Sequence, residues 1–330
     1  MRKLLVAGAV AASLASPCAH AGLTLTADGV SLGFTLTTFL SGYNAQYGPL
    51  AQGIASNGNV ITGSLLNNQI YVFRDVDGQT LSNAVTSVPY TCMTGNCNYA
   101  MTTAGGSVYG AQAFGGVYQT FANNGTFTPV AGLSNLTSYL GMWGDPVNGH
   151  IISASNSGLV DINPIAGTFR VIADIFPDGV SVSPDGTTAW VELGGTIQSF
   201  DIASGAHIHT YNTGNSPDGT GVITGGQLNG DVVVNNNNGT MQLIDPSKAD
   251  GDPLQIRLIA TGGTRGDFVS PDVSNGTLFV SQNEAVDRLS CGPNCSIGVP
   301  GIPEPETYAL MLGGLGMLSL LVRRRRMQGR

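Results

Sequence analysis

Four aspartates are the residues whose type and placement could do chemistry, because each lies near the expected start of a β-strand. They are Asp145, Asp178, Asp218 and Asp267. Asp178 and Asp218 are both followed by glycine, which indicates equivalent positions. If the four side chains converge on one axis, their oxygens would suit Ca²⁺ or another divalent cation. The simpler interpretation, which we prefer, is that each carboxylate accepts backbone N–H bonds in a turn. We therefore expect no cofactor, with a divalent cation as the alternative.

The other polar groups do not complete a catalytic site. Glu192 is the only glutamate between residues 22 and 250, and it falls in a second strand rather than an inner one. Asp75 and Asp77 resemble part of a calcium loop but lack its third acidic residue and its bidentate glutamate, so a turn between a third and a fourth strand explains them better. The histidines beyond residue 22 are too scattered for a zinc site: His150, His207 and His209. An enzyme is therefore not our primary expectation.

Four cysteines form two close pairs, Cys92 with Cys97 and Cys291 with Cys295. Glycine and asparagine lie between the members of each pair, and both residue types favour tight turns. In an oxidising compartment such pairs predict two local disulfides. A metal site with four thiolates is the alternative, but the spacings differ from the CxxC pairs of zinc ribbons.

The elements that must position these residues repeat along the chain. An apolar strand, a glycine-containing turn, a second strand and an alternating third strand recur, as in residues 179–202. The last apolar residues of the third strands lie 48, 41, 40, 42 and 45 positions apart: Phe73, Phe121, Ile162, Ile202, Ile244 and Leu289. A period of about 40–50 residues built from short strands is typical of a β-propeller with one four-stranded blade per repeat. We therefore predict an all-β fold with six blades.

The two ends of the repeat region predict how the ring closes. The last repeat lacks a fourth strand, because Cys291 follows Leu289 almost at once. Residues 33–40 precede the first repeat and have no partner. We expect them to supply the missing outer strand, which joins the chain ends and protects an open edge. Seven blades are the alternative, with the extra one between Phe73 and Phe121.

The Ser-Pro-Asp-Gly turn at residues 183–186 and the run Gly-Gly-Thr-Ile-Gln-Ser-Phe-Asp-Ile at 194–202 resemble repeats of YVTN and NHL/SMP-30-like propellers. The resemblance extends in period over the central region and implies the propeller fold. It implies no activity by itself, because propellers include enzymes, lectins and scaffolds. SMP-30-like lactonases hold a divalent metal through Glu, Asn and Asp at the channel mouth, and a full set of those ligands has no match here.

The N-terminus predicts export. Met1-Arg2-Lys3, an apolar run at residues 4–14 and the sequence Ala19-His20-Ala21 are the three parts of a signal peptide, with cleavage expected after Ala21. The net charge is −8, and C-terminal arginines hold much of the positive charge, so the central region is strongly acidic. Clustered Lys and Arg are needed to bind phosphates, and we therefore expect no nucleic-acid partner.

The C-terminus combines Pro-Glu-Pro, a glycine-containing apolar run and an arginine cluster, in that order. The residues expected to act in sorting are Pro303, Glu304, Pro305, Arg323, Arg324, Arg325 and Arg326. As a single helix, the run from Tyr308 to Val322 would be about 22 Å long, which is short for a permanent membrane span. This tail closely resembles the PEP-CTERM sorting signal of Gram-negative bacteria. The resemblance implies cleavage by a membrane exosortase and association with exopolysaccharide.

These features divide the chain into a signal peptide (1–21), a β-propeller (22–300) and a sorting signal (301–330). We expect export across the inner membrane of a Gram-negative bacterium, with the membrane contacted only through the C-terminal helix before processing. The propeller would then act at the cell surface or in the extracellular matrix as a binding or matrix module for exopolysaccharide or another glycan. The alternative is an exported metal-dependent hydrolase or lyase of the SMP-30-like type.

Overall fold

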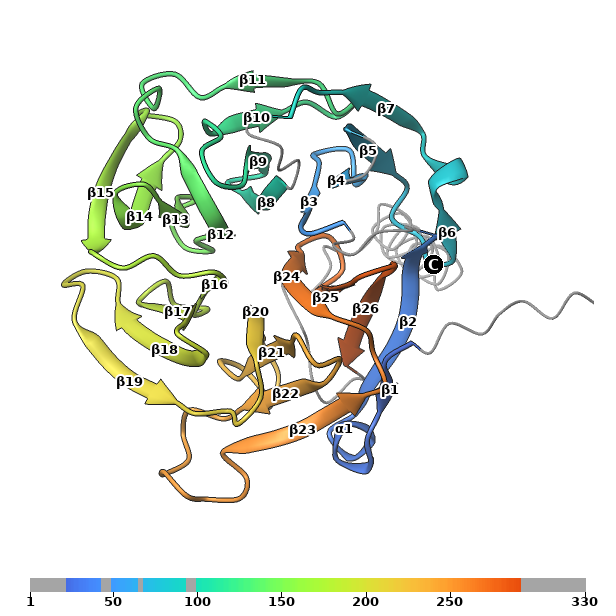
Figure 1. Cartoon of the computed structure of the whole chain (residues 1–330), viewed down its shortest axis with the longest axis vertical. Helices are drawn as coiled ribbons and strands as arrows, with labels where there is room; N and C mark the ends of the chain where they lie inside the picture. The colour runs from blue at the N-terminus through green and yellow to red at the C-terminus, as the bar shows by residue number, and fades with distance from the viewer. Residues whose placement is uncertain (1–21, 43–48, 65–67, 93–98, 292–330) are drawn as a thin grey trace, which may run out of the picture.

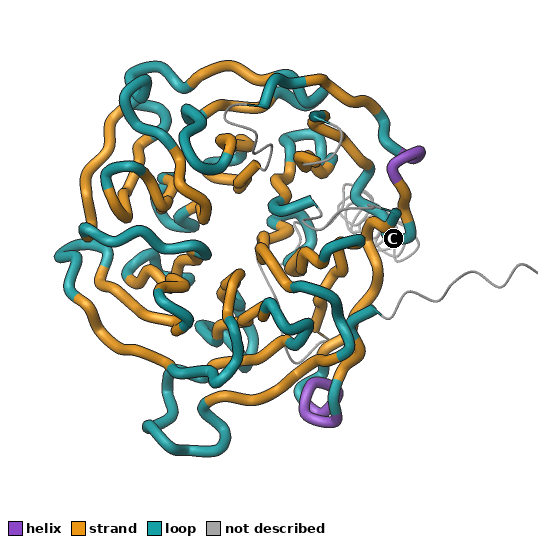
Figure 2. The backbone as a smooth tube through the Cα atoms, in the orientation of Figure 1, coloured by secondary structure: helices purple, strands orange, loops and turns teal. Residues whose placement is uncertain are grey.

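The structure is a computed structural model that describes residues 22–42, 49–64, 68–92 and 99–291. Within these residues the strands form six sheets arranged as blades around a central axis (Figure 1). Helix is limited to two short segments, and strand and loop make up the rest of the described chain (Figure 2). The all-β, six-bladed prediction is confirmed, and the alternative of seven blades is wrong. No helix in the described ranges is long and apolar enough to cross a membrane.

Blades 1 to 4 each contain four antiparallel strands that are paired in chain order from the axis outwards. Blade 1 consists of β3 (Gln52–Ile54), β4 (Val60–Ser64), β5 (Gln69–Phe73) and β7 (Thr86–Pro89). Blade 2 consists of β8 (Tyr99–Ala104), β9 (Ser107–Gln112), β10 (Gln119–Phe121) and β11 (Phe127–Pro129). Blade 3 consists of β12 (Ser138–Gly144), β13 (Ile151–Ser155), β14 (Gly158–Asn163) and β15 (Thr168–Ala173). Blade 4 consists of β16 (Val180–Val182), β17 (Thr188–Leu193), β18 (Thr196–Asp201) and β19 (His207–Tyr211).

Blades 5 and 6 have five strands each, because segments from elsewhere in the chain join them. Blade 5 consists of β20 (Pro217–Val222), β21 (Val232–Asn236), β22 (Met241–Ile244), β23 (Ile256–Thr261) and β1 (Thr24–Leu25). Blade 6 consists of β24 (Gly266–Asp272), β25 (Thr277–Gln282), β26 (Ala285–Cys291), β2 (Phe34–Ser41) and β6 (Gln79–Thr80). The wide interval between Phe73 and Phe121 contains β6 and the short helix η1 (Leu81–Asn83) rather than an extra blade.

The predicted ring closure is confirmed by the pairing of β2 with β26. The two strands are antiparallel, with Phe34 opposite Cys291 and Ser41 opposite Ala285. The segment before β2 also takes part, which the repeat pattern does not indicate. Its strand β1 extends blade 5 by pairing with β23, and the five-residue helix α1 (Ala27–Ser31) then reverses the chain toward blade 6. The N-terminal segment therefore binds two neighbouring blades.

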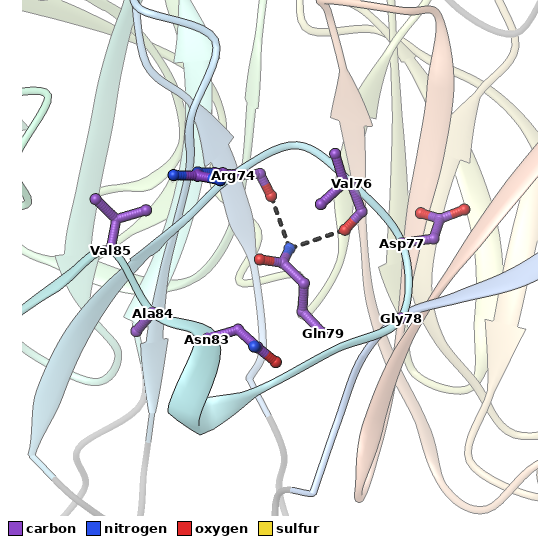
Figure 3. A pocket seen from close by; sticks show the side chains of 8 residues that line it. All are labelled: Arg74, Val76, Asp77, Gly78, Gln79, Asn83, Ala84 and Val85. Atoms are coloured by element: carbon purple, nitrogen blue, oxygen red, sulfur yellow. Dashed lines mark hydrogen bonds between the residues drawn. The ribbon is translucent and has the colours of Figure 1, made fainter.

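A buried arginine joins blade 6 to blade 1. Arg288, on β26, contacts three carboxylates: Asp272 in its own blade, and Asp75 and Asp77 in the loop after β5. Its Nε lies 2.8 Å from Asp77 Oδ1. The loop is held in shape by Gln79, whose amide donates to the carbonyls of Arg74 and Val76 (Figure 3). The aspartates that resemble part of a calcium loop therefore lie between the third and fourth strands, as expected, and bind an arginine.

Candidate binding site on the upper face

The two faces of the ring carry opposite ends of the same strands. We call the face where the inner strands β12, β16, β20 and β24 begin the upper face, and the other the lower face. Since neighbouring strands in a blade are antiparallel, second strands such as β17 and β21 end on the upper face. Loops on one face therefore come from the starts of inner strands and the ends of second strands.

Three of the four candidate aspartates meet on the upper face. Asp178 lies just before β16, while Asp218 and Asp267 are the second residues of β20 and β24. The glycine that follows Asp178 or Asp218 packs closely against the backbone of the next inner strand. A Cβ on Gly179 would lie 2.4 Å from the carbonyl oxygen of Asp218, and one on Gly219 would lie 2.0 Å from that of Asp267. The three aspartates therefore occupy successive, equivalent steps around the axis.

Burial and the repulsion between neighbouring carboxylates both raise the pKa values of these groups. Burial, the charge of Asp218 and that of Glu192 raise the pKa of Asp178 to about 7. The pKa of Asp267 is also raised, first by burial and then by the charge of Asp218. Glu192 stands at the end of β17, which brings it to the same face, and burial raises its pKa as well. A second-strand position therefore does not remove this glutamate from the site.

One arginine partly balances these carboxylates. Arg265 Nη2 lies 3.1 Å from Asp218 Oδ2, and its Nε donates to Asn237 Oδ1. Even so, burial keeps the pKa of Asp218 above its ordinary value. The charge of Arg265 opposes the rise in pKa at Asp178, Asp218 and Asp267, and this cluster of carboxyl groups is negative when they are ionised. The nearness of Arg265 to Asp267 in the sequence is the one signal that could have indicated its role.

The run from Asn235 to Asn238 combines the end of a strand with a polar turn. Asn235 and Asn236 belong to β21 and are fully buried. The side-chain amide of Asn235 donates to the carbonyls of Asp267 and Ser281, at 3.0 and 2.8 Å. It therefore fixes β24, which carries Asp267, against the neighbouring blade. The turn itself contains Asn237, the partner of Arg265.

Asp145 does not join the other three aspartates, so its expected position at the start of an inner strand is wrong. It follows the last residue of β12 and therefore lies on the lower face. Its Oδ1 accepts the backbone N–H of Val147 at 2.8 Å, and its own N–H donates to the His150 carbonyl. This is the turn-forming role that aspartates in loops commonly have.

The aspartates do not fit a metal ion in the described structure. No group of three or more His, Cys, Asp or Glu side chains in the described ranges could hold one. Arg265 and Asn237 already bond to Asp218 on the upper face. A cation in the same place would have to displace the guanidinium group. We therefore derive no chemistry through a metal.

Three exposed aromatic rings extend the cluster across blades 2 to 4. Phe114 follows β9, Tyr139 is in β12, and Phe176 lies two residues before Asp178. Ring centroids are 5.0 Å apart for Phe114 and Tyr139, and 6.3 Å apart for Tyr139 and Phe176. Their exposed fractions are 43%, 37% and 48%. We call these residues the aromatic row. Nothing in their spacing along the chain predicts it.

Phe114 is held in a backbone conformation that a phenylalanine rarely adopts. Its φ is 59°, in the left-handed region that favours glycine. Its N–H donates to the Tyr139 carbonyl at 2.8 Å, and the N–H of Gly115 donates to Ser138 at 2.9 Å. Such conformations cost about 1–3 kcal/mol and persist where surrounding contacts impose them, often at functional sites. Blade 3 thus fixes the position of a ring on blade 2.

The remaining predicted residues lie partly outside the described ranges. Cys92 and Cys291 are described, but Cys97 and Cys295 are not, so the two disulfides stay predictions. The signal peptide at residues 1–21 and the sorting residues also lie outside: Pro303, Glu304, Pro305, Arg323, Arg324, Arg325 and Arg326.

Comparison with known proteins assigns the C-terminal tail. A model of the PEP-CTERM protein-sorting motif matches residues 301–326. The motif implies secretion, a C-terminal membrane-anchored sorting signal of Gram-negative bacteria, and processing by an exosortase. A search of curated proteins found no match.

Solved structures match the propeller. A gluconolactonase from Xanthomonas campestris matches with a TM-score of 0.57 at 16% identity, over 81% of this chain and 94% of that chain. A luciferin-regenerating enzyme matches with a TM-score of 0.54 at 10% identity, over 82% and 99%. A streptogramin B lyase matches with a TM-score of 0.50 at 14% identity, over 79% and 98%. At these identities the likeness shows the fold alone. The chain is thus an exported protein with a PEP-CTERM sorting motif and a six-bladed β-propeller similar to gluconolactonase-type structures.

Proposed function

We propose that the propeller is a binding module that takes a carbohydrate on its upper face. The observation that supports this most is the aromatic row, which continues directly into the cluster of carboxyl groups. Tyr139 lies two residues before Gly141, and a Cβ on that glycine would lie 2.3 Å from the Asp178 carbonyl oxygen. The aromatic row therefore adjoins Asp178 at the edge of the carboxyl cluster, while Asp218 and Asp267 lie buried behind it.

The chemistry of this surface suits a sugar. An exposed aromatic ring offers apolar area at low entropic cost, and the C–H face of a pyranose ring can cover it. Carboxylates and the Asn237 amide oxygen accept hydrogen bonds from hydroxyl groups, while Arg265 donates them. A neutral, hydroxyl-rich ligand also avoids the repulsion that an anionic ligand would meet from Asp178, Asp218 and Asp267.

The route of the protein is consistent with such a ligand. Its sorting motif belongs to exported proteins, and we propose that cleavage leaves the propeller at the cell surface or in the exopolysaccharide matrix. The last described strand, β26, ends on the lower face, so the chain leaves the propeller on the side opposite the aromatic row. A tail still anchored in the membrane would therefore leave the upper face free for a glycan.

A glycan array followed by calorimetric titration tests the proposal. We expect Tyr139→Ala to weaken binding of the best-bound oligosaccharide by about tenfold or more, the loss typical of a central aromatic contact. Phe169→Ala is the matched control, because Phe169 is 42% exposed but lies on the outer strand β15. An array without any bound glycan, or equal losses in the two variants, would exclude this surface as the binding site.

The metal-dependent hydrolase or lyase remains the rival hypothesis, although the described carboxylates do not form a metal site. The same oligosaccharide distinguishes the two functions. A binding module returns it unchanged after long incubation with Ca²⁺ or Mg²⁺. Cleavage that depends on the added cation would instead favour the enzyme.

A further inference from the structure

A second feature of the upper side is a small cavity away from the aromatic row. It has a volume of about 290 Å³ and lies between the N-terminal segment, β2 and the turn that joins β25 to β26. The lining residues that matter here are Gly22, Thr38, Glu284 and Asp287. Lysine, arginine and histidine are absent from the described lining. The cavity therefore has two carboxyl groups and no basic side chain in the part that the structure describes.

Asp287 is buried in the wall of this cavity, with 6% of its surface exposed. Thr38 lies opposite Asp287 on the paired strand β2, and its hydroxyl donates a hydrogen bond of 3.0 Å to Asp287 Oδ1. Arg288, the next residue, faces the other side of the sheet and binds Asp75, Asp77 and Asp272. Burial without a cationic neighbour raises the pKa of Asp287 to about 6. A buried carboxyl of this kind is stabilised by a cation that enters the cavity.

Gly22 lines the same cavity. It is the residue that follows the expected signal-peptide cleavage site after Ala21. Strand β1 holds it nearby, because Thr24 pairs with Thr261 at the end of β23. A Cβ built on Gly22 would have no atom within 4 Å, so the residue has room to turn into the cavity.

We propose that this cavity is an ammonium-binding site, and that its occupant is the α-ammonium group created at Gly22 by removal of the signal peptide. In the uncleaved chain the nitrogen of Gly22 is a neutral amide. After cleavage it carries a positive charge and three N–H donors, which suit the carboxyl groups of Asp287 and Glu284. Maturation would thus complete the contact between the N-terminal segment and blade 6. The inference rests on cleavage after Ala21 and is independent of the carbohydrate proposal.

The test compares exported, processed protein with a variant that has two serines inserted between Ala21 and Gly22. The insertion moves the new N-terminus by about 7 Å. We expect the wild-type chain to begin at Gly22 by mass spectrometry and to melt about 2–5 °C above the extended chain at pH 7.5. With Asp287→Asn this difference should disappear. With Asp231→Asn, which alters another buried aspartate that does not line the cavity and lies at the lower-face start of β21, it should persist.

The α-amine gives a second readout that a merely structural role would not move. Its pKa, measured from the pH dependence of reductive methylation, should exceed the ordinary value of about 8 and return to it with Asp287→Asn. Methylammonium chloride should raise the melting temperature of the extended chain alone. The proposal is overturned if the two chains melt together, if the pKa is ordinary in both, or if processing occurs elsewhere. It is also overturned if methylammonium stabilises the wild-type chain equally, since the site would then serve a soluble amine.

Discussion

Replacing Arg288 with methionine tests whether the positive charge of this side chain holds blades 6 and 1 of the propeller together. The side chain is 7% exposed, and Asp272, one of its three carboxylate partners, is fully buried. The guanidinium carbon also lies 4.7 Å from the ring centre of Phe279 and 5.2 Å from that of Phe39. Methionine keeps most of the apolar volume but leaves the carboxylates without a cation.

The expected loss follows from burial. Removing one partner of a buried ion pair costs about 3–5 kcal/mol, because the remaining charge has no compensation. The lost contact with the two rings adds about 1 kcal/mol. Each kcal/mol lowers the melting temperature of a domain of this size by about 2–4 °C, so Arg288→Met should lower it by about 10 °C or more.

Calorimetry at two pH values checks both the size and the cause. The deficit of Arg288→Met should be smaller at pH 5 than at pH 8, because protonation neutralises the unpaired carboxylates, and Asp272→Asn should restore part of the lost stability. Lys248→Met is the control, since its 3.9 Å pair with Asp245 is partly exposed and should contribute less than about 1 kcal/mol. A loss for Arg288→Met no greater than that of the control would refute the idea that this charge holds blades 6 and 1 together.

Three further predictions concern pH, packing and sorting. The pKa values of Asp178 and Asp231, raised to about 7, mean that the folded state binds protons more tightly than the unfolded state. Stability should therefore fall as the pH rises from about 4 through 7, and Asp178→Asn should flatten that slope in urea titrations. Gly179→Ala should lower the free energy of unfolding by about 2 kcal/mol or more, because the new Cβ would lie 2.4 Å from the Asp218 carbonyl oxygen; an unchanged denaturation midpoint would contradict the close strand contact. Mass spectrometry of exported protein should find Arg323–Arg326 absent in a strain with a working exosortase and present without one.

The repeat could be predicted from sequence because propeller blades are built from local contacts. The third strand of blades 1 to 5 ends on an apolar residue or next to one, so these residues recur with the period of the blades. Phe73, Phe121, Ile162 and Ile244 therefore all lie in third strands, and Leu289 lies in β26. The missing fourth strand of the last repeat indicated where residues 33–40 must pair.

The residues around the candidate site could be predicted only in part. Asp178 and Asp218 share a local pattern with glycine, and their glycines do make the close strand contacts that place them side by side. The sequence pattern assigns Asp145 to the same position of its repeat, but this residue follows the inner strand β12 instead of preceding it. Because strand direction decides the face of the ring, that shift of a few residues moves its carboxylate to the opposite end.

The sequence by itself determined the secondary-structure class, the number of blades, the way the ring closes and the sorting tail, since each depends on local order along the chain. Only the tertiary structure decided which side chains meet. Arg288 and Asp77 are 211 residues apart, and the aromatic row draws on three different blades. Such contacts depend on the twist and spacing of whole sheets around an axis, which no local pattern of residues records. For the same reason, the four aspartates singled out from the sequence became three on the upper face and one in a turn on the lower.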